Sequence, residues 1–211
     1  MIESNFKKYS PLEKLNVSRE TFPVLEEFRS LLVNENQKIN LISKSTVKDS
    51  INRHILDTAQ IIDIIDKNSK SCIDLGSGSG LPGIVLAIIF KKKGSKIKFE
   101  LYEKSQKKSN FLQKMINHFE LNAEVKKKNI FEEKELEADL VVARAFKPLK
   151  IILELINKNF AHYNELIFFL GESGREIIKE CLMTWNFDYQ IIKSLTDKNS
   201  VIVKIKNLKK K

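Results

Sequence analysis

Four of the seven glycines in this chain fall within eight residues. They belong to the segment at residues 74–83, which reads D-L-G-S-G-S-G-L-P-G. A β-prone apolar run, residues 71–75, leads into this segment, and an apolar run typical of a helix, residues 81–92, follows it. Glycine adopts positive φ at little cost and lets a ligand approach the main chain closely. In α/β proteins a glycine loop between strand and helix lies at the carboxyl ends of the strands, where ligands bind. The segment therefore predicts a small-molecule site.

Two ligands fit the letters of this loop. Residues 78–83 spell G-x-G-x-x-G, the dinucleotide signature, whereas the stretch from Asp74 reads D-x-G-x-G-x-G. A dinucleotide site keeps a helix N-terminus free for a pyrophosphate. S-adenosylmethionine has no phosphate and carries a sulfonium and an ammonium group, so the carboxylate of Asp74 favours it. Alternatively, Asp74 caps the loop or the helix. Glu103, which ends the next β-prone run, would accept hydrogen bonds from ribose hydroxyls with either ligand.

Signals for other chemistry are weak. The three histidines and two cysteines are scattered and make no metal-ligand spacing, so we expect no metal. The sequence contains neither a Walker loop nor a G-x-S-x-G nucleophile elbow. A Y-x-x-x-K match at residues 189–193 falls in a predicted strand, where positions four apart lie about 13 Å from each other. We therefore assign no catalytic acid, base or nucleophile.

Two further clusters are candidates for function. Residues 53–57 read R-H-I-L-D on a predicted helix, where Arg53 and Asp57 are spaced for an intrahelical ion pair. Residues 144–147 read R-A-F-K at the end of a predicted strand, on the edge of a doubly wound sheet that borders the ligand crevice. Arg144 is one of only five arginines, and an aromatic residue follows it two positions later. We expect Arg144 to function in that crevice.

The elements that must position these residues fall into two parts. Residues 1–66 contain no glycine and predict a helical extension, with one helix through Val24 and Leu32 and a second from about Ser45 to Ile62. Residues 67–211 predict an α/β domain, because β-prone and helical runs alternate and so favour a mostly parallel, doubly wound sheet. Two β-prone runs four residues apart predict a C-terminal antiparallel hairpin at the sheet edge. The expected strands span 71–75, 97–103, 123–127, 139–144 and 166–170, the expected helices 81–92, 106–121, 149–160 and 174–184, and the hairpin runs 189–195 and 200–205.

Composition narrows the class of protein. The chain has 211 residues, 42% of them hydrophobic, and no apolar run approaches the roughly 18 residues of a membrane helix. Its polar start excludes a secretory signal peptide. The formal net charge of +10 is compatible with a polyanionic partner such as nucleic acid. However, 32 of the 37 cations are Lys, so charge alone is weak support for phosphate recognition, which favours Arg.

The motifs together resemble one family. They are N-L-I-S at residues 40–43, R-H-I-L-D at 53–57, the glycine loop with Ile84 after it, and R-A-F at 144–146. In this order and spacing they are similar to the bacterial ribosomal RNA small subunit methyltransferase G family, also called glucose-inhibited division protein B. The resemblance covers about residues 36–169. It implies a class I (Rossmann-like) S-adenosylmethionine-dependent methyltransferase fold with an N-terminal helical extension.

The resemblance also implies an activity and a set of site residues. The activity is methyl transfer from S-adenosylmethionine to N7 of a guanine in the decoding-site loop of 16S rRNA. The partner is then 16S rRNA within the small ribosomal subunit, in the cytoplasm, with no membrane and no obligate protein partner. The expected cofactor-binding residues are Asp74, Gly76, Gly78, Gly80, Leu81, Glu103, Asn129, Ile130 and Arg144, and the expected RNA-binding residues are Arg53, His54, Phe146 and Lys147.

The chain departs from the family at two places. The family usually has Leu-Lys-Gly after the fifth strand, whereas this chain has Leu170-Gly171-Glu172. Asn129 and Ile130 also differ from the commoner residues at their positions, so their assignment rests on spacing. Two alternatives stay open from the residues themselves. One is an NAD-dependent oxidoreductase, from the literal G-x-G-x-x-G, and the other is a non-catalytic RNA-binding module.

Overall fold

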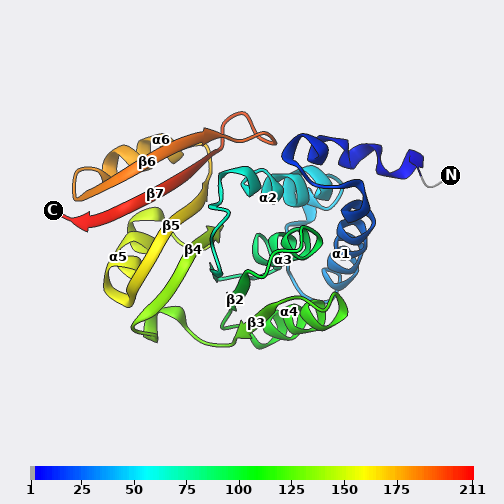
Figure 1. Cartoon of the computed structure of the whole chain (residues 1–211), viewed down its shortest axis with the longest axis horizontal. Coiled ribbons are helices and arrows are strands. Elements are labelled where there is room, and N and C mark those ends of the chain that lie inside the picture. Colours follow the sequence, from blue (N-terminus) through cyan, green and yellow to red (C-terminus); the bar gives the residue numbers. More distant parts are fainter. Residues whose placement is uncertain (1–2) are drawn as a thin grey trace.

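A seven-stranded sheet forms the centre of the molecule. The computed structural model describes residues 3–211, and its strands follow the order β3-β2-β1-β4-β5-β7-β6 (Figure 1). Neighbours from β3 to β5 pair in parallel, whereas β7 pairs antiparallel with both β5 and β6. The strands are β1 (Ser71–Leu75), β2 (Lys98–Tyr102), β3 (Ala123–Lys126), β4 (Leu136–Arg144), β5 (Phe160–Leu170), β6 (Trp185–Lys193) and β7 (Val201–Lys210). The doubly wound sheet with a terminal hairpin is therefore confirmed.

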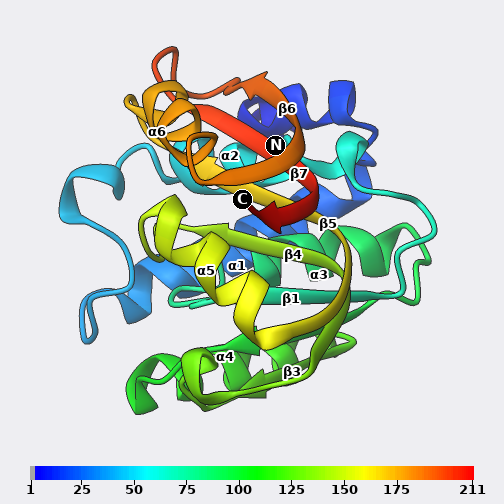
Figure 2. The same cartoon turned by 90° about the vertical axis from the view of Figure 1, so that its left-hand side faces the viewer.

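Helices cover both faces of the sheet. Helices α1 (Phe22–Glu35), α3 (Gly83–Lys92) and α4 (Gln106–His118) lie on one face, and α5 (Leu149–Asn159) and α6 (Gly174–Cys181) lie on the other (Figures 1 and 2). Helix α3 is apolar all round, with seven buried residues, because β1 and β2 cover one side and the N-terminal region covers the other. None of the described helices is both long enough and apolar enough to cross a membrane.

The N-terminal region packs onto the sheet domain. Tyr9, Leu12 and Phe28 are fully buried in the same hydrophobic cluster as Leu86 of α3 and Leu101 of β2. The hydrophobic core therefore continues across residue 66, where the sequence predicts the boundary between the two parts. Besides α1, the region contains η1 (Glu3–Leu15), η2 (Arg19–Thr21), η3 (Lys44–Thr46), η4 (Ile51–Leu56), α2 (Asp57–Ala59) and η5 (Ile62–Ile64).

The second N-terminal helix differs from the expectation. The sequence pattern predicts one helix from about Ser45 to Ile62, but the chain forms two 3₁₀ turns, a π-helical turn and a short α-helix instead. Insertions of π geometry widen a helix locally and often occur at functional sites. Here the π turn η4 carries Arg53 and His54, and Asp57 follows directly. All three side chains bond to segments outside this helix.

Strand order decides where a ligand can bind. The chain leaves β3 at one edge and returns to the other side of β1 as β4, so the carboxyl ends of β1 and β4 lie at a topological switch point. Crevices at such points bind ligands in open α/β sheets. The glycine loop follows β1, and Arg144 is the last residue of β4. Two segments that are distant in the sequence therefore meet at one site.

Candidate functional site

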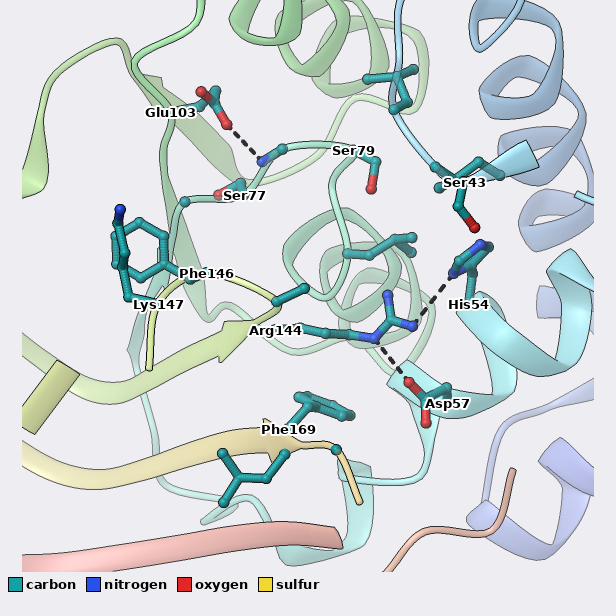
Figure 3. A pocket seen from close by; sticks show the side chains of 18 of the residues that line it. Ser43, His54, Asp57, Ser77, Ser79, Glu103, Arg144, Phe146, Lys147 and Phe169 are labelled. Atoms are coloured by element: carbon teal, nitrogen blue, oxygen red, sulfur yellow. Dashed lines mark hydrogen bonds and ion pairs between the residues drawn. The ribbon is translucent and has the colours of Figure 1, made fainter. Parts of the chain in front are cut away.

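A cavity of about 810 Å³ opens at the carboxyl ends of the strands (Figure 3). Its walls come from the glycine loop, the ends of β2, β4 and β5, the loop before η6 (Ile130–Glu132), the segment at residues 41–57, and the β6–β7 turn. Ligand pockets for small organic molecules usually measure about 300–1,000 Å³. This cavity therefore falls in the upper part of that range.

The glycine loop adopts a conformation that requires glycine. Gly76, Gly78 and Gly80 have φ values of +67°, +54° and +82°. A Cβ atom on Gly76 would lie 2.2 Å from Cδ2 of Phe146, so the aromatic ring rests directly on bare main chain. Gly76 and Gly78 line the cavity, whereas Gly80 packs beneath the loop against Ile84 and Leu112. Gly80 thus shapes the loop from beneath and does not line the cavity.

Asp74 is turned away from the cavity. Its side chain is 1% exposed, and one carboxylate oxygen accepts a 3.0 Å hydrogen bond from the main-chain N–H of Gly83, at the start of α3. Among residues 3–211 the other oxygen has no hydrogen-bond partner. Burial raises the pKa of this carboxyl to about 7, and nearby Glu103 adds to the shift. Asp74 caps α3, the alternative that the sequence left open, and it does not line the cavity. Its expected contact with the cation of a cofactor stays a prediction.

The cap also bears on the dinucleotide alternative. A pyrophosphate would need the N–H groups at the start of α3. Asp74 occupies one of them, and a Cβ atom on Gly83 would lie 2.3 Å from Leu101 and 2.6 Å from Asp74, so this end of α3 is packed tightly. A buried carboxylate beside a pyrophosphate would be repulsive. The local structure therefore disfavours a dinucleotide in this loop.

Glu103 holds the loop from the end of β2. Its two carboxylate oxygens accept hydrogen bonds from the main-chain N–H groups of Gly78, at 3.0 Å, and Ser105, at 2.7 Å. The side chain is buried, yet it lines the cavity (Figure 3). An ionised carboxylate has about four acceptor sites, so it can still accept from hydroxyl groups of a ligand. Glu103 therefore both fixes the loop and lines the cavity.

Residues after β3 form the neighbouring wall. Asn129 caps the short helix η6 by accepting from the N–H of Phe131, and Ile130 is buried beneath the cavity. Phe131 stacks on Phe146 with ring centroids 6.0 Å apart and an interplanar angle of 26°. An apolar wall with an aromatic pair thus lies beside Glu103. The sequence did not single out Phe131, because its packing against Phe146 depends on the fold.

Arg144 connects β4 with the N-terminal region. Its Nε atom donates to Asp57 at 2.8 Å, and Nη2 donates to the main-chain oxygen of Arg53 at 2.6 Å. Arg53 itself pairs with Asp197 in the β6–β7 turn at 2.9 Å. The intrahelical ion pair between Arg53 and Asp57 that their spacing allows is therefore absent. Both charges instead join elements that are distant in sequence.

Asp57 is the centre of this polar cluster. Besides Arg144 it accepts hydrogen bonds from Gln60, at 2.8 Å, and from Thr196 of the β6–β7 turn, at 2.7 Å. The turn also supplies Ser194 and Asp197 to the cavity wall. Sequence reasoning missed the turn, because its contacts with residues 53–60 span more than 130 positions. The polar composition of the β6–β7 turn predicts a hairpin turn and nothing more.

His54 is held neutral in the same wall. It is 5% exposed, and burial, followed by the charge of Arg144, lowers its pKa to about 4. Its Nε2 atom lies 3.0 Å from Oγ1 of Thr46, which in turn donates to the main-chain oxygen of Ser43. Leu41 and Ile42 complete this side of the cavity, and the side chain of Asn36 orders them by accepting from both of their N–H groups.

Lysines surround the opening of the cavity. Lys104, Lys108, Lys128 and Lys147 all line it, and among the described residues only Lys128 of these four has an ion-pair partner, Glu133 at 2.9 Å. Where the family usually has Lys after the fifth strand, Gly171 lines the cavity, and Glu172 accepts from Asn199 of the β6–β7 turn. No group of His, Cys, Asp and Glu in the described residues could hold a metal ion.

The structure gathers most of the residues that the sequence singled out. Asp74 and Gly80 lie outside the cavity wall; the other expected residues line it, namely Arg53, His54, Gly76, Gly78, Leu81, Glu103, Asn129, Ile130, Arg144, Phe146 and Lys147. Of the motifs in the N-terminal region, the segment at residues 40–43 had no expected role, yet it contributes Leu41, Ile42 and Ser43. The cavity therefore joins a glycine-loop side to an N-terminal side.

Comparisons with known proteins agree on one family. A family model described as rRNA small subunit methyltransferase G matches residues 22–205. The chain is 47% identical, over 212 aligned residues and the full length of both chains, to a Pelagibacter ubique protein named ribosomal RNA small subunit methyltransferase G. A Bartonella tribocorum protein of the same name is 37% identical, covering 99% of this chain and 97% of its own.

Solved structures with low sequence identity share the fold. One is an S-adenosylmethionine-dependent methyltransferase from Aquifex aeolicus, with a TM-score of 0.56, 14% identity, and coverage of 78% of this chain and 98% of its own. Another is M. capricolum TrmK in complex with S-adenosylhomocysteine, with a TM-score of 0.53, 16% identity, and coverage of 79% and 69%. These likenesses establish a Rossmann-like α/β methyltransferase fold.

Proposed function

The chain belongs to the rRNA small subunit methyltransferase G family, and from this premise we propose that it transfers a methyl group from S-adenosylmethionine to N7 of a guanine in the decoding-site loop of 16S rRNA. It is an S-adenosylmethionine-dependent methyltransferase, as the matches along its whole length indicate. The particular atom and the loop follow from the family resemblance of its motifs. Its partner is then the small ribosomal subunit, in the cytoplasm.

The residues of the cavity fit the cofactor. Gly76 and Gly78 present bare main chain at positive φ, and Glu103 lines the cavity beside them. Glu103 would accept from the ribose hydroxyls, while Asn129, Ile130 and the neighbouring aromatic pair would flank the adenine. Leu81 would contribute apolar contact from the loop. When bound, S-adenosylmethionine supplies a methyl group activated by its positively charged sulfur.

The chemistry fits the absence of an assigned acid or base. N7 of guanine already carries an available lone pair, so no proton has to be removed before it attacks. Alignment of two reactants alone can supply up to roughly 7–11 kcal/mol of a barrier. Of the titratable side chains in this wall, His54 most resembles a general base. However, its pKa is about 4, and its Nε2 atom is hydrogen-bonded to Thr46. The residues of this wall therefore act by positioning the methyl group and N7 relative to each other.

The RNA would present an unpaired base to the cavity. N7 lies in the deep major groove of A-form RNA, which side chains cannot reach, so the target must be a loop or a splayed base. Phe146 offers an aromatic face, and stacking of one base is worth about 1–3 kcal/mol. Lys147, Lys104 and Lys108 lie at the opening and would contact phosphates. Arg53 and His54 belong to the opposite wall, on the N-terminal side.

One observation carries this proposal. A single cavity is bounded on one side by the glycine loop with Glu103 and on the other by the family motifs at residues 40–43 and 53–57. Its volume of about 810 Å³ lies within the range of pockets that bind small organic molecules. An NAD-dependent oxidoreductase would instead need a free N-terminus of α3 for the pyrophosphate, and Asp74 caps that terminus.

The test is methyl transfer to small ribosomal subunits purified from cells that lack this protein. Radiolabelled S-adenosylmethionine provides the methyl group, and mass spectrometry of the digested 16S rRNA identifies the product. We expect one equivalent of 7-methylguanosine per subunit at a single position. Calorimetry should show binding of S-adenosylhomocysteine and none of NAD. Cofactor binding without methyl transfer would favour the RNA-binding module, whereas NAD binding would favour the oxidoreductase.

A further inference from the structure

The guanidinium of Arg144 is only partly engaged by the protein. A guanidinium has five N–H donors. One, on Nε, bonds Asp57, and the two on Nη2 point to the main-chain oxygen of Arg53 and to Nδ1 of His54, at 2.6 and 3.4 Å. Within the described residues Nη1 has no hydrogen-bond partner. Figure 3 shows this third nitrogen directed away from Asp57, on the side of the glycine loop.

His54 fixes the orientation of that guanidinium. Arginine offers no acceptor, so Nδ1 of His54 must be the acceptor of their contact, and the ring proton must lie on Nε2. Nε2 then donates to Thr46 Oγ1 at 3.0 Å, and the Thr46 hydroxyl donates to Ser43 at 2.9 Å. The donor and the acceptor of each hydrogen bond in this series are therefore determined. The free Nη1 group is therefore a fixed donor, since rotation of the side chain would break three contacts.

A fixed donor at this place can distinguish purines. Adenine and guanine both offer a nucleophilic N7, and near it they differ at position 6, where guanine has an accepting oxygen and adenine a donating amino group. An arginine that donated to N7 would block the lone pair needed for attack. A contact with O6 leaves N7 free. We propose that Nη1 of Arg144 donates to O6 of the target guanine and so selects guanine over adenine, an inference that rests on the proposed function.

The charges around Arg144 suit this role. Methylation at N7 makes the purine cationic, and an isolated arginine nearby would oppose that charge. Asp57 lies 2.8 Å from Nε, with both side chains largely buried at 20% and 14% exposure, so the pair is neutral as a unit. His54 is neutral as well at physiological pH. The wall therefore offers a directed hydrogen-bond donor with little net positive charge.

The experiment compares rates on altered bases. Once mass spectrometry has mapped the methylated position, 16S rRNA carrying guanosine, inosine or 2-aminopurine riboside at that position is assembled into small subunits. Inosine keeps O6 and lacks the 2-amino group, whereas 2-aminopurine keeps N7 and lacks O6. Single-turnover methylation rates are then measured for the wild type, for Arg144→Met, and for the control Arg175→Met. Arg175 is exposed on α6 and does not line the cavity.

The expected result is a loss of discrimination. The wild type should methylate guanosine and inosine at similar rates and 2-aminopurine at least tenfold more slowly. Arg144→Met should reduce the ratio of the guanosine to the 2-aminopurine rate by at least tenfold, which is about 1.4 kcal/mol. The intrinsic reactivity of each N7 cancels in this comparison. Arg175→Met should keep the wild-type ratio.

The contrary outcomes are distinct. An equal slowing of both substrates by Arg144→Met would overturn the inference and leave the proposed function intact. A tenfold loss of S-adenosylhomocysteine affinity with an unchanged ratio would assign Arg144 to the cofactor carboxylate instead. No 7-methylguanosine from the wild type would overturn the proposed function and the inference with it. Because Arg144→Met leaves Asp57 unpaired, the double variant Asp57→Asn/Arg144→Met, which removes both charges, is measured in parallel.

Discussion

Replacement of Asp74 by asparagine should stabilise the cofactor-free protein far more at pH 8 than at pH 5. The carboxyl of Asp74 is buried at the start of α3, and burial raises its pKa to about 7. In the unfolded chain an aspartate titrates near pH 3.9. Because the pKa of Asp74 is higher in the folded state than in the unfolded state, protonation of Asp74 stabilises the folded protein. That stabilisation is complete below about pH 4 and disappears as the pH rises through about 7.

The magnitude follows from the two pKa values. Their difference of about three units corresponds to roughly 4 kcal/mol over the whole titration, at 1.36 kcal/mol per unit. Between pH 5 and pH 8 the wild type should lose about 2–3 kcal/mol of this amount. The amide of asparagine does not titrate, and its oxygen can still accept from the N–H of Gly83. The free-energy difference between Asp74→Asn and the wild type should therefore grow by about 2–3 kcal/mol in favour of the variant.

Urea unfolding of both proteins at pH 5, 6, 7 and 8 measures this difference directly. Glu137→Gln is the matched control, because it makes the same carboxylate-to-amide exchange at an exposed position of β4. A constant offset between Asp74→Asn and the wild type across this pH range would refute the reasoning. It would mean that the N–H of Gly83 and the start of α3 compensate the buried charge fully.

Three further substitutions test the site. Gly76→Ala places a Cβ atom 2.2 Å from Phe146 at a φ of +67°, so calorimetry should show S-adenosylhomocysteine binding at least tenfold more weakly; wild-type affinity would mean that the ring moves freely. Glu103→Gln leaves one accepting oxygen in place of two, so the same titration should again show about a tenfold loss, and an unchanged constant would remove Glu103 from the cofactor site. Asp57→Ala leaves the largely buried Arg144 unpaired, so the free energy of unfolding in urea should fall by about 3–5 kcal/mol; a loss below about 1 kcal/mol would show that water compensates Arg144.

Local patterns predicted the sheet domain well. Its helices and the first three strands appear near the expected positions, because alternating β-prone and amphipathic runs, separated by short loops, reflect local preferences and burial. The later strands extend beyond their expected ranges, since β5 begins at Phe160 and β7 ends at Lys210. The N-terminal region was harder. The run from Ser45 to Ile62 has helical spacing, yet η4 adopts π geometry. Bonds from Arg53 and Asp57 to other segments accompany that geometry, and such bonds leave no periodic signal.

Charge pairing failed as a local prediction for the same reason. Arg53 and Asp57 stand four residues apart, which favours a pair on an isolated helix. In the folded chain Asp57 lies beside Arg144, and Arg53 lies beside Asp197. The pair between Arg144 and Asp57 is largely shielded from water, so its two charges attract each other more strongly than those of a pair on an exposed helix.

The sequence by itself determined the glycine loop, the succession of strands and helices along the chain, and the motifs that identify the family, because each depends on residues close together in the chain. The tertiary structure alone decided which way each charged side chain points. It turned Asp74 toward α3, and it brought the β6–β7 turn against residues 53–60. The physical reason is that a side chain's hydrogen-bond partners are set by which strands become neighbours, and strand order is a property of the whole fold.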